Sequence, residues 1–115
     1  MAQFLDIEVK DRLLLIRTKN EELGPNEAEE LRLAVSEWID KDIKGAVVSL
    51  ALAEYMSSIF LSALIEIMKE FKAKKMELAL AELSAKNIEI LRVTKLENVF
   101  RIFDSSYEAC QAMKK

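Results

Sequence analysis

The chain of 115 residues contains no histidine and only one cysteine, Cys110. Without histidine, neither Ser-His nor Cys-His nucleophilic catalysis is available, and the commonest protein metal ligand is missing. One cysteine cannot form a disulfide within the chain, and the two absences together argue against a zinc site. The flanking sequence YEACQAM favours a packed helix position for Cys110, with a reactive thiol as the alternative. No glycine-rich phosphate loop is present. We therefore expect no metal, no cofactor and no enzymatic activity.

Basic character and long apolar runs are also lacking. The formal net charge is −3, so nucleic acid is not an expected partner. No apolar run reaches the roughly 20 residues needed to span a bilayer, so we expect no direct membrane insertion. The first residues, MAQFLDIEVKD, do not have the basic-then-apolar order of a signal peptide. With 51% hydrophobic and 32% charged residues, the composition is typical of a globular protein. We expect one cytoplasmic domain over residues 1–115.

Two glycines and one proline leave few breaks, which makes the expected elements easy to separate. Alternating or continuous apolar runs predict strands at 4–9, 12–18, 46–52, 76–81 and 99–103. Helical spacing predicts helices that begin near Pro25, span 58–74 and 84–96, and close the chain from Ser105. The order is ββαβαβαβα. It indicates an α/β fold with a mixed sheet, an initial hairpin plus parallel strands, packed against about four helices.

Serines are expected to begin three of these helices. Ser84 is the expected cap of helix 84–96, whose inward-facing residues would be Ile88, Leu91 and Ile90. Ser105 and Glu108 have the spacing of a capping box. The acidic segment NEELGPNEAEE fits the positive end of the first helix, with partner-facing charge as the alternative.

The adjacent serines Ser57 and Ser58 stand at the start of an apolar helix, where a serine hydroxyl can have either of two roles. Either serine can cap the helix, and a hydroxyl at a helix N-terminus is also an acceptable place for a phosphate. The helix 58–74 carries one core stripe at helical spacing: Leu61, Leu64, Ile65, Met68 and Phe71. Four further apolar residues lie partly beside this stripe, and they indicate either deep burial or a partner-facing patch: Ile59, Phe60, Ala63 and Ile67.

Three stretches resemble the STAS domain (sulphate transporter and anti-sigma factor antagonist) in its stand-alone bacterial form. VVSLALAEYMSSIFLSAL is similar to the family's strand, connection and helix, where an Asp-Ser-Ser/Ala-Gly-Leu-Gly motif begins the helix. SAKNIEILRVTKLENVFRIFDSSYEA is similar to its C-terminal half. RTKNEELGPNEAEELRLAV matches more loosely the second strand, the acidic loop and the first helix. The resemblance implies the STAS fold over most of the chain.

The resemblance also implies a function in transcription regulation. In this family an unphosphorylated domain binds an anti-sigma factor, usually a GHKL-type serine kinase, and so frees a sigma factor. Phosphorylation of the serine at the helix start abolishes that binding. On this alignment Ser58 is the phosphoacceptor candidate, ahead of Ser57. The partner-binding surface would comprise Glu54, Tyr55, Met56, Ile59, Phe60, Ser62, Ala63 and Ile67.

Several positions depart from the family motif. Ser57 stands where the motif has Asp, Ile59 where it has a small residue, and Phe60 where it has the first glycine. Phe60 is therefore expected to crowd a kinase that approaches the serines. Gly24 stands where the acidic loop of the family has another functional Asp. The alternative function is a STAS-type accessory subunit that binds the ATPase of an ABC lipid transporter, and a homodimer also stays open.

Overall fold

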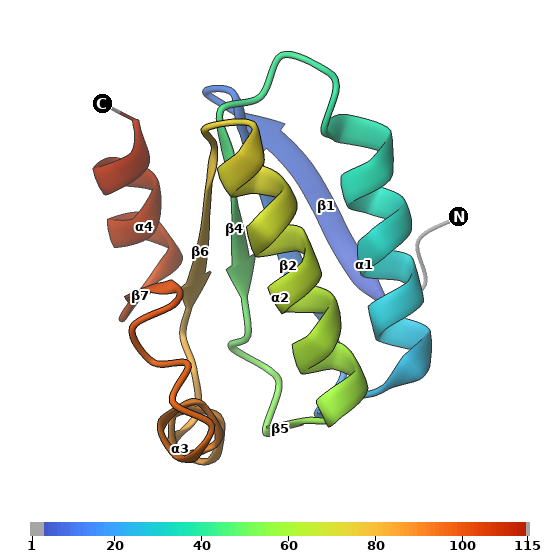
Figure 1. Cartoon of the computed structure of the whole chain (residues 1–115), viewed down its shortest axis with the longest axis vertical. Helices are drawn as coiled ribbons and strands as arrows, with labels where there is room; N and C mark the ends of the chain where they lie inside the picture. The colour runs from blue at the N-terminus through green and yellow to red at the C-terminus, as the bar shows by residue number, and fades with distance from the viewer. Residues whose placement is uncertain (1–3, 115) are drawn as a thin grey trace.

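The computed structural model describes residues 4–114, which form a central five-stranded sheet in the order β1-β2-β4-β6-β7 (Figure 1). β1 (Leu5–Lys10) and β2 (Leu13–Thr18) make an antiparallel hairpin. β4 (Gly45–Ser49), β6 (Glu77–Ala81) and β7 (Arg101–Phe103) run parallel to β2 and to one another. The predicted mixed sheet, with an initial hairpin followed by parallel strands, is confirmed.

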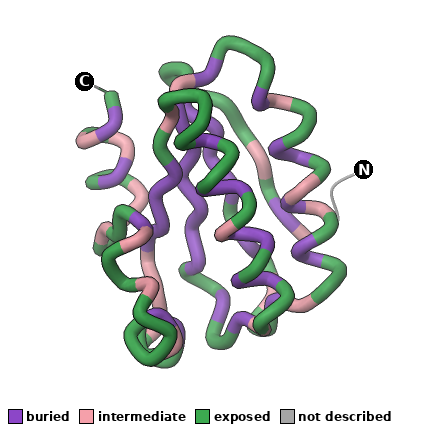
Figure 2. The backbone as a smooth tube through the Cα atoms, in the orientation of Figure 1, coloured by how far each residue is buried: buried purple, intermediate pink, exposed green. Residues whose placement is uncertain are grey.

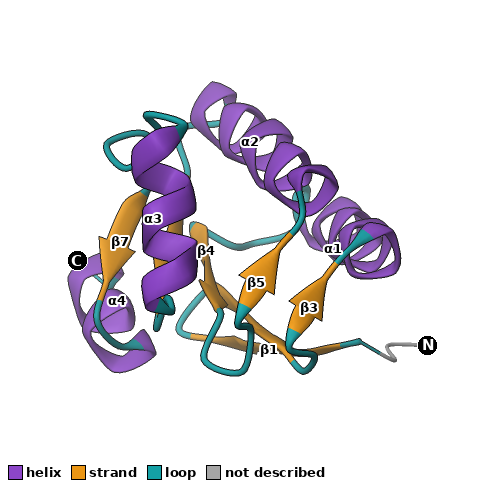
Figure 3. Ribbon diagram, turned by 90° about the horizontal axis from the view of Figure 1, so that it is seen from below, coloured by secondary structure: helices purple, strands orange, loops and turns teal. Residues whose placement is uncertain are grey.

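Helices pack on both faces of this sheet and at one of its ends. α1 (Pro25–Trp38) and α2 (Ser58–Ala73) lie side by side on one face, and α4 (Ser106–Met113) lies on the other (Figures 1 and 3). α3 (Ala85–Val93) lies beyond the end toward which the parallel strands β4 and β6 point. Since ligands and partners of parallel sheets commonly approach this carboxyl end, the loops between the strands and α3 are of functional interest.

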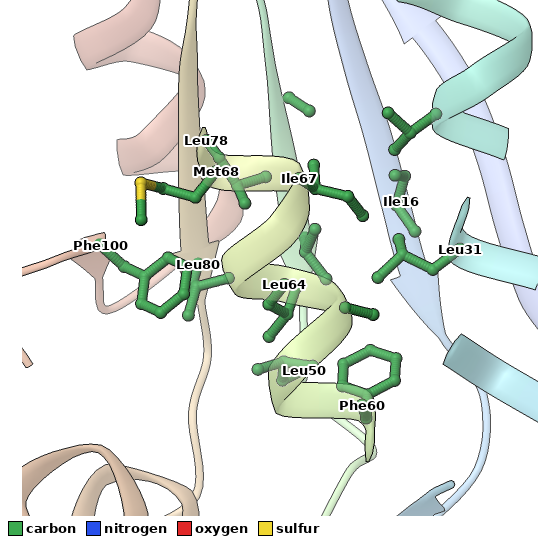
Figure 4. Close-up of a cluster of buried hydrophobic side chains, with 14 of the residues drawn as sticks. Ile16, Leu31, Leu50, Phe60, Leu64, Ile67, Met68, Leu78, Leu80 and Phe100 are labelled. Carbon is green, nitrogen blue, oxygen red and sulfur yellow. The ribbon is translucent and has the colours of Figure 1, made fainter. Parts of the chain in front are cut away.

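Hydrophobic side chains fill both sides of the sheet because successive strand residues point to opposite faces. On β2, Leu14 and Ile16 face α1 and α2, whereas Leu13 and Leu15 belong to the smaller core under α4. All residues of β4 are buried, as a strand covered on both faces requires (Figure 2). α2 contributes Phe60, Leu64 and Ile67 to the larger core (Figure 4). Each such side chain contributes about 1.5–3 kcal/mol when fully buried.

A second, two-stranded sheet lies beside the carboxyl end of the main sheet and was not predicted. It pairs β3 (Glu22–Leu23) with β5 (Tyr55–Met56) in parallel (Figure 3). Strands of two residues are too short to show an alternating pattern, which is the signal used to predict strands. This small sheet joins the segment before α1 to the segment before α2.

The inward face of α3 differs from the one predicted. Leu91 is buried as expected and Ile90 is half-buried, but Ile88 is 40% exposed. Asn87 is fully buried in its place. The prediction that Ile88 faces inward is therefore wrong. It assumed that the inner residues of a helix are apolar, and here the backbone of a neighbouring loop provides hydrogen-bonding partners for a polar one.

Three predicted elements extend two or more residues beyond the observed ones. The strand predicted from residue 99 begins only at Arg101. The strand predicted to reach residue 52 ends at Ser49, because the chain turns there and the Ala53 amide donates to the Leu50 carbonyl oxygen at 3.0 Å. The helix predicted to reach residue 96 ends at Val93. Lys95 has a φ of 61°, and a residue in this left-handed region commonly terminates a helix.

Candidate functional site

The segment from Ala53 to Ser57 connects the main sheet to α2 and is held along one side by the backbone before α1. The amides of Glu54 and Tyr55 both donate to the Glu21 carbonyl oxygen, at 2.7 and 3.0 Å. The Ser57 amide donates to the Leu23 carbonyl oxygen at 2.9 Å. These bonds fix the start of α2 relative to the acidic segment, as the small β3–β5 sheet requires.

Ser57 is the N-cap of α2. Its hydroxyl oxygen accepts a hydrogen bond from the Phe60 amide at 3.3 Å, and its carbonyl oxygen accepts one from the Leu61 amide at 3.0 Å. Side-chain capping of this kind satisfies one of the amides that a helix start leaves without a partner. The prediction that a serine caps this helix is confirmed for Ser57.

Ser58 occupies a different environment from its neighbour. It is the first residue of α2, it is exposed, and its hydroxyl makes no hydrogen bond to another residue in the range 4–114. The first turn of α2 contains no acidic side chain, so no carboxylate of that turn balances the positive end of the helix dipole. The electrostatics at Ser58 therefore favour an added anion.

The residues predicted to bind a partner divide into two groups. Four are exposed or border the surface: Glu54, Tyr55, Ile59 and Ser62. The other four are buried in the core, so they are not part of an exposed contact surface: Met56, Phe60, Ala63 and Ile67. The deep-burial alternative stated for the four apolar residues beside the core stripe of α2 therefore holds for three of them and fails for Ile59. We call the exposed group together with Ser58 the loop–α2 surface. Tyr55 and Ile59 are its large apolar members, 48% and 47% exposed.

Two open hollows meet at Tyr55. One has a volume of about 650 Å³ and is lined by Tyr55 together with the polar residues Lys19, Asn20, Glu21, Glu22, Glu54 and Lys86. The other, about 440 Å³, lies between Tyr55 and α3 and is lined mainly by apolar atoms of Ala85, Lys86, Glu89 and Ile90. The position of α3 beside this site was not predicted. The lining residues are some 30 positions from Tyr55 in the chain, and only the expectation that strand carboxyl ends share one edge could have brought them together.

The acidic segment that leads into α1 contains a buried carboxylate in the first turn of that helix. Glu27 is buried and accepts hydrogen bonds from the Gly24 amide at 2.9 Å and from Asn20 Nδ2 at 2.6 Å. Burial alone would raise the pKa of Glu27, but these hydrogen bonds outweigh burial and lower it. Glu21 and Glu22 remain exposed at the rim of the polar hollow. The hydrogen bonds at the start of α1 thus account for Glu27, whereas Glu21, Glu22 and Glu29 are exposed and accessible to a partner.

Within residues 4–114, no group of three or more Cys, Asp and Glu side chains is arranged to hold a metal ion. None of the four helices in this range combines the length and apolar character needed to cross a membrane. The thiol of Cys110 lies partly buried on α4, and burial raises its pKa above the ordinary value.

Known structures with the same fold were found at low sequence identity. The protein TM1081 of Thermotoga maritima aligns with a TM-score of 0.85 and 21% identity, covering 100% of this chain and 91% of its own. An anti-sigma-factor antagonist (STAS) domain protein of Planctomyces limnophilus has a TM-score of 0.83 and 20% identity, covering 95% and 96%. The Bacillus cell fate determinant SpoIIAA in its phosphorylated form has a TM-score of 0.74 and 17% identity, covering 94% and 97%.

At these identities the three structures establish likeness of fold alone. The family is assigned from the sequence instead. The sequence model of the STAS domain family matches residues 4–109. This range includes the sheet, the first three helices and the start of α4. The chain belongs to the STAS domain family.

Proposed function

We propose that the chain is an anti-sigma factor antagonist, which acts by binding an anti-sigma factor of the GHKL serine kinase type and catalyses no reaction itself. The observation that carries this proposal is the position of Ser58, exposed as the first residue of α2 and adjacent in sequence to the exposed Ile59. A regulated hydroxyl next to an apolar contact surface is what a phosphate-controlled binding protein needs. The solved relative SpoIIAA is described as an anti-sigma factor antagonist and in a phosphorylated form.

Phosphorylation at Ser58 would act on binding while the fold persists. A phosphate adds about −1.5 to −2 charges at neutral pH, and the positive end of α2 accommodates such an anion. The same phosphate would stand beside Ile59 in the loop–α2 surface. A partner that covers this surface would have to strip water from a strongly hydrated anion, which is costly when no cation compensates it. The partner would therefore be released.

Ser57 is a poorer phosphoacceptor than Ser58. Its hydroxyl oxygen caps α2 by accepting from the Phe60 amide, and phosphorylation there would replace an existing structural contact. The expectation that Phe60 crowds an approaching kinase does not hold, because the Phe60 side chain is fully buried. Ile59, which is 47% exposed, is the bulky residue beside Ser58 instead.

Affinity purification from the source organism tests the proposal. The tagged chain is expected to retain a GHKL-type serine kinase, and mass spectrometry should find phosphate on Ser58 in the unbound pool. The matched control is the tagged Tyr55→Ala variant, which removes an exposed apolar side chain of the loop–α2 surface and should retain less kinase. A second copy of the chain as the sole bound protein would overturn the proposal in favour of a homodimer.

A second candidate function is an accessory subunit that binds the ATPase of an ABC lipid transporter. The observation in its favour is the environment of Ser58, where Ile59 replaces a small residue of the family motif and restricts access by a kinase. In this case the same purification would retain an ABC ATPase, and both serines would be unmodified. Ser57 would then serve only as the cap of α2.

A further inference from the structure

Asn87 is a fully buried polar residue in α3, and both ends of its side-chain amide bond the segment before α2. Its Nδ2 donates to the Ala53 carbonyl oxygen at 3.2 Å, and its Oδ1 accepts from the Met56 amide at 3.1 Å. These partners are 34 and 31 residues away in sequence. The side chain thus spans the turn that carries Tyr55.

A buried amide is a costly choice for a helix position unless it is hydrogen-bonded, and an apolar side chain of similar size would fill the space without that cost. The backbone of the loop explains the choice. The amides of Tyr55 and Ser57 point toward β3, so the Met56 amide between them points the other way, toward α3. Ala53 and Met56 are themselves buried, so their backbone groups could not turn to water if Asn87 were apolar.

The first turn of α3 adds two contacts to the same segment. Ser84 caps α3 by accepting from the Asn87 amide at 3.1 Å, and its hydroxyl donates to the Glu54 carbonyl oxygen at 3.0 Å. Lys86 forms an exposed ion pair with the Glu54 carboxylate at 3.2 Å. With β3 on one side and α3 on the other, the loop is fixed from Ala53 to Ser57, while the Tyr55 side chain stays exposed.

We propose that Asn87 is a positioning residue for partner binding, which holds Tyr55 and the start of α2 in the orientation that the partner contacts. The proposal rests on the function proposed above. Asn87 does not touch the partner, since it is fully buried. It acts through the backbone of Ala53 and Met56, and it makes α3 and the loop–α2 surface one preorganised unit. Preorganisation favours binding because less conformational freedom is lost on association.

The test compares Asn87→Leu with wild type by amide hydrogen exchange and by affinity for the anti-sigma factor. Leucine keeps the approximate size and removes both hydrogen bonds. Exchange of the Met56 amide should accelerate at least tenfold relative to the Val48 amide in β4, and the Kd for the partner should rise about tenfold. Asn87→Ala serves as a second variant in case leucine prevents folding, with the same two results expected.

A control variant separates positioning from general stability. Leu78→Val removes a buried methylene at the start of β6, at the opposite end of the sheet from the loop. It should destabilise the fold without a selective change at Met56 or a change in Kd. If Leu78→Val weakens binding as much as Asn87→Leu does, the role of Asn87 is one of general stability and the proposal is overturned.

The two readouts also separate this proposal from the proposed function. Unchanged exchange at Met56 in both Asn87 variants would overturn the positioning role, and so would faster exchange with unchanged affinity. Both of these results leave the binding function intact. If the wild-type chain binds no anti-sigma factor, the proposed function fails, and the role of Asn87 in partner binding is overturned with it.

Discussion

The Ser57 hydroxyl oxygen accepts a hydrogen bond from the Phe60 amide at 3.3 Å, and this contact distinguishes the two adjacent serines. Ser57 is half-buried and completes the start of α2, whereas Ser58 is exposed. One serine therefore contributes to stability, and the other is available on the surface for modification.

Replacement of Ser57 by alanine is expected to lower the free energy of unfolding by about 1 kcal/mol, since a helix loses its N-cap. Ser58→Ala should change it by less than about 0.5 kcal/mol, as is usual for exposed positions without specific contacts. Urea unfolding followed by circular dichroism measures both. An equal loss in the two variants would show that Ser57 has no special capping role.

Tyr55→Ala and Ile59→Ala are expected to weaken binding to the anti-sigma factor at least tenfold each, because exposed apolar side chains at the centre of an interface carry much of its affinity. Their unfolding free energies should change by less than about 0.5 kcal/mol. The control is Tyr107→Ala, which removes an exposed aromatic side chain from α4 on the opposite face of the sheet. If Tyr107→Ala weakens binding and the other two do not, the partner binds the α4 face instead.

Glu82 links the end of β6 to the start of α4 and gives the fold a predictable pH dependence. Its carboxylate accepts hydrogen bonds from the Ser49 hydroxyl, from the Ser106 amide at 2.7 Å and from the Ser106 hydroxyl at 2.8 Å. Burial alone would raise the pKa of Glu82, but these bonds and the nearby charge of Arg17 outweigh it, so the pKa lies below its ordinary value of 4.5.

A carboxylate whose pKa is lowered by folding stabilises the folded state above its ordinary pKa, and this contribution disappears as the pH falls through the lowered value. Glu82→Gln is therefore expected to cost about 1–2 kcal/mol at pH 7, where hydrogen bonds to a charged acceptor are lost. The loss relative to wild type should shrink as the pH falls below the ordinary pKa of 4.5 and through the lowered value. The unfolding free energies of wild type and Glu82→Gln, measured from pH 3 to 7, test this pH dependence. The control is Glu70→Gln, which replaces an exposed carboxylate on α2. A constant difference at all pH values would argue against the role assigned to the Glu82 charge.

The strand and helix order was predictable because most elements of the main sheet carry a recognisable apolar pattern between polar or glycine-containing ends, although β7 has only three residues. The caps at Ser57, Ser84 and Ser105 were predictable for the same local reason, since a serine before an apolar helical run has few other roles. β3 and β5 could not be predicted, because each has only two residues and depends on the other for its hydrogen bonds.

The candidate site was only partly predictable. Its location at the start of α2 follows from the local sequence, but the rotation of α2 does not, because Ile59, Phe60 and Ala63 are all apolar and any of them could face the core. Packing against the sheet decides that Phe60 and Ala63 are buried and Ile59 is exposed. Asn87 gave no local signal, since the backbone groups that it bonds lie more than 30 residues earlier.

The most direct test of the proposed function is the affinity of the purified chain for each GHKL-type anti-sigma factor of its source organism, measured by isothermal titration calorimetry. Wild type, Ser58→Ala and Ser58→Asp are compared, because aspartate places a negative charge where the phosphate would be. Wild type and Ser58→Ala should bind with equal affinity. Ser58→Asp should bind at least tenfold more weakly, a difference of about 1.4 kcal/mol, with its unfolding free energy unchanged. Equal affinity in all three would contradict the phosphate switch, and no binding by wild type to any of these proteins would contradict the proposed function itself.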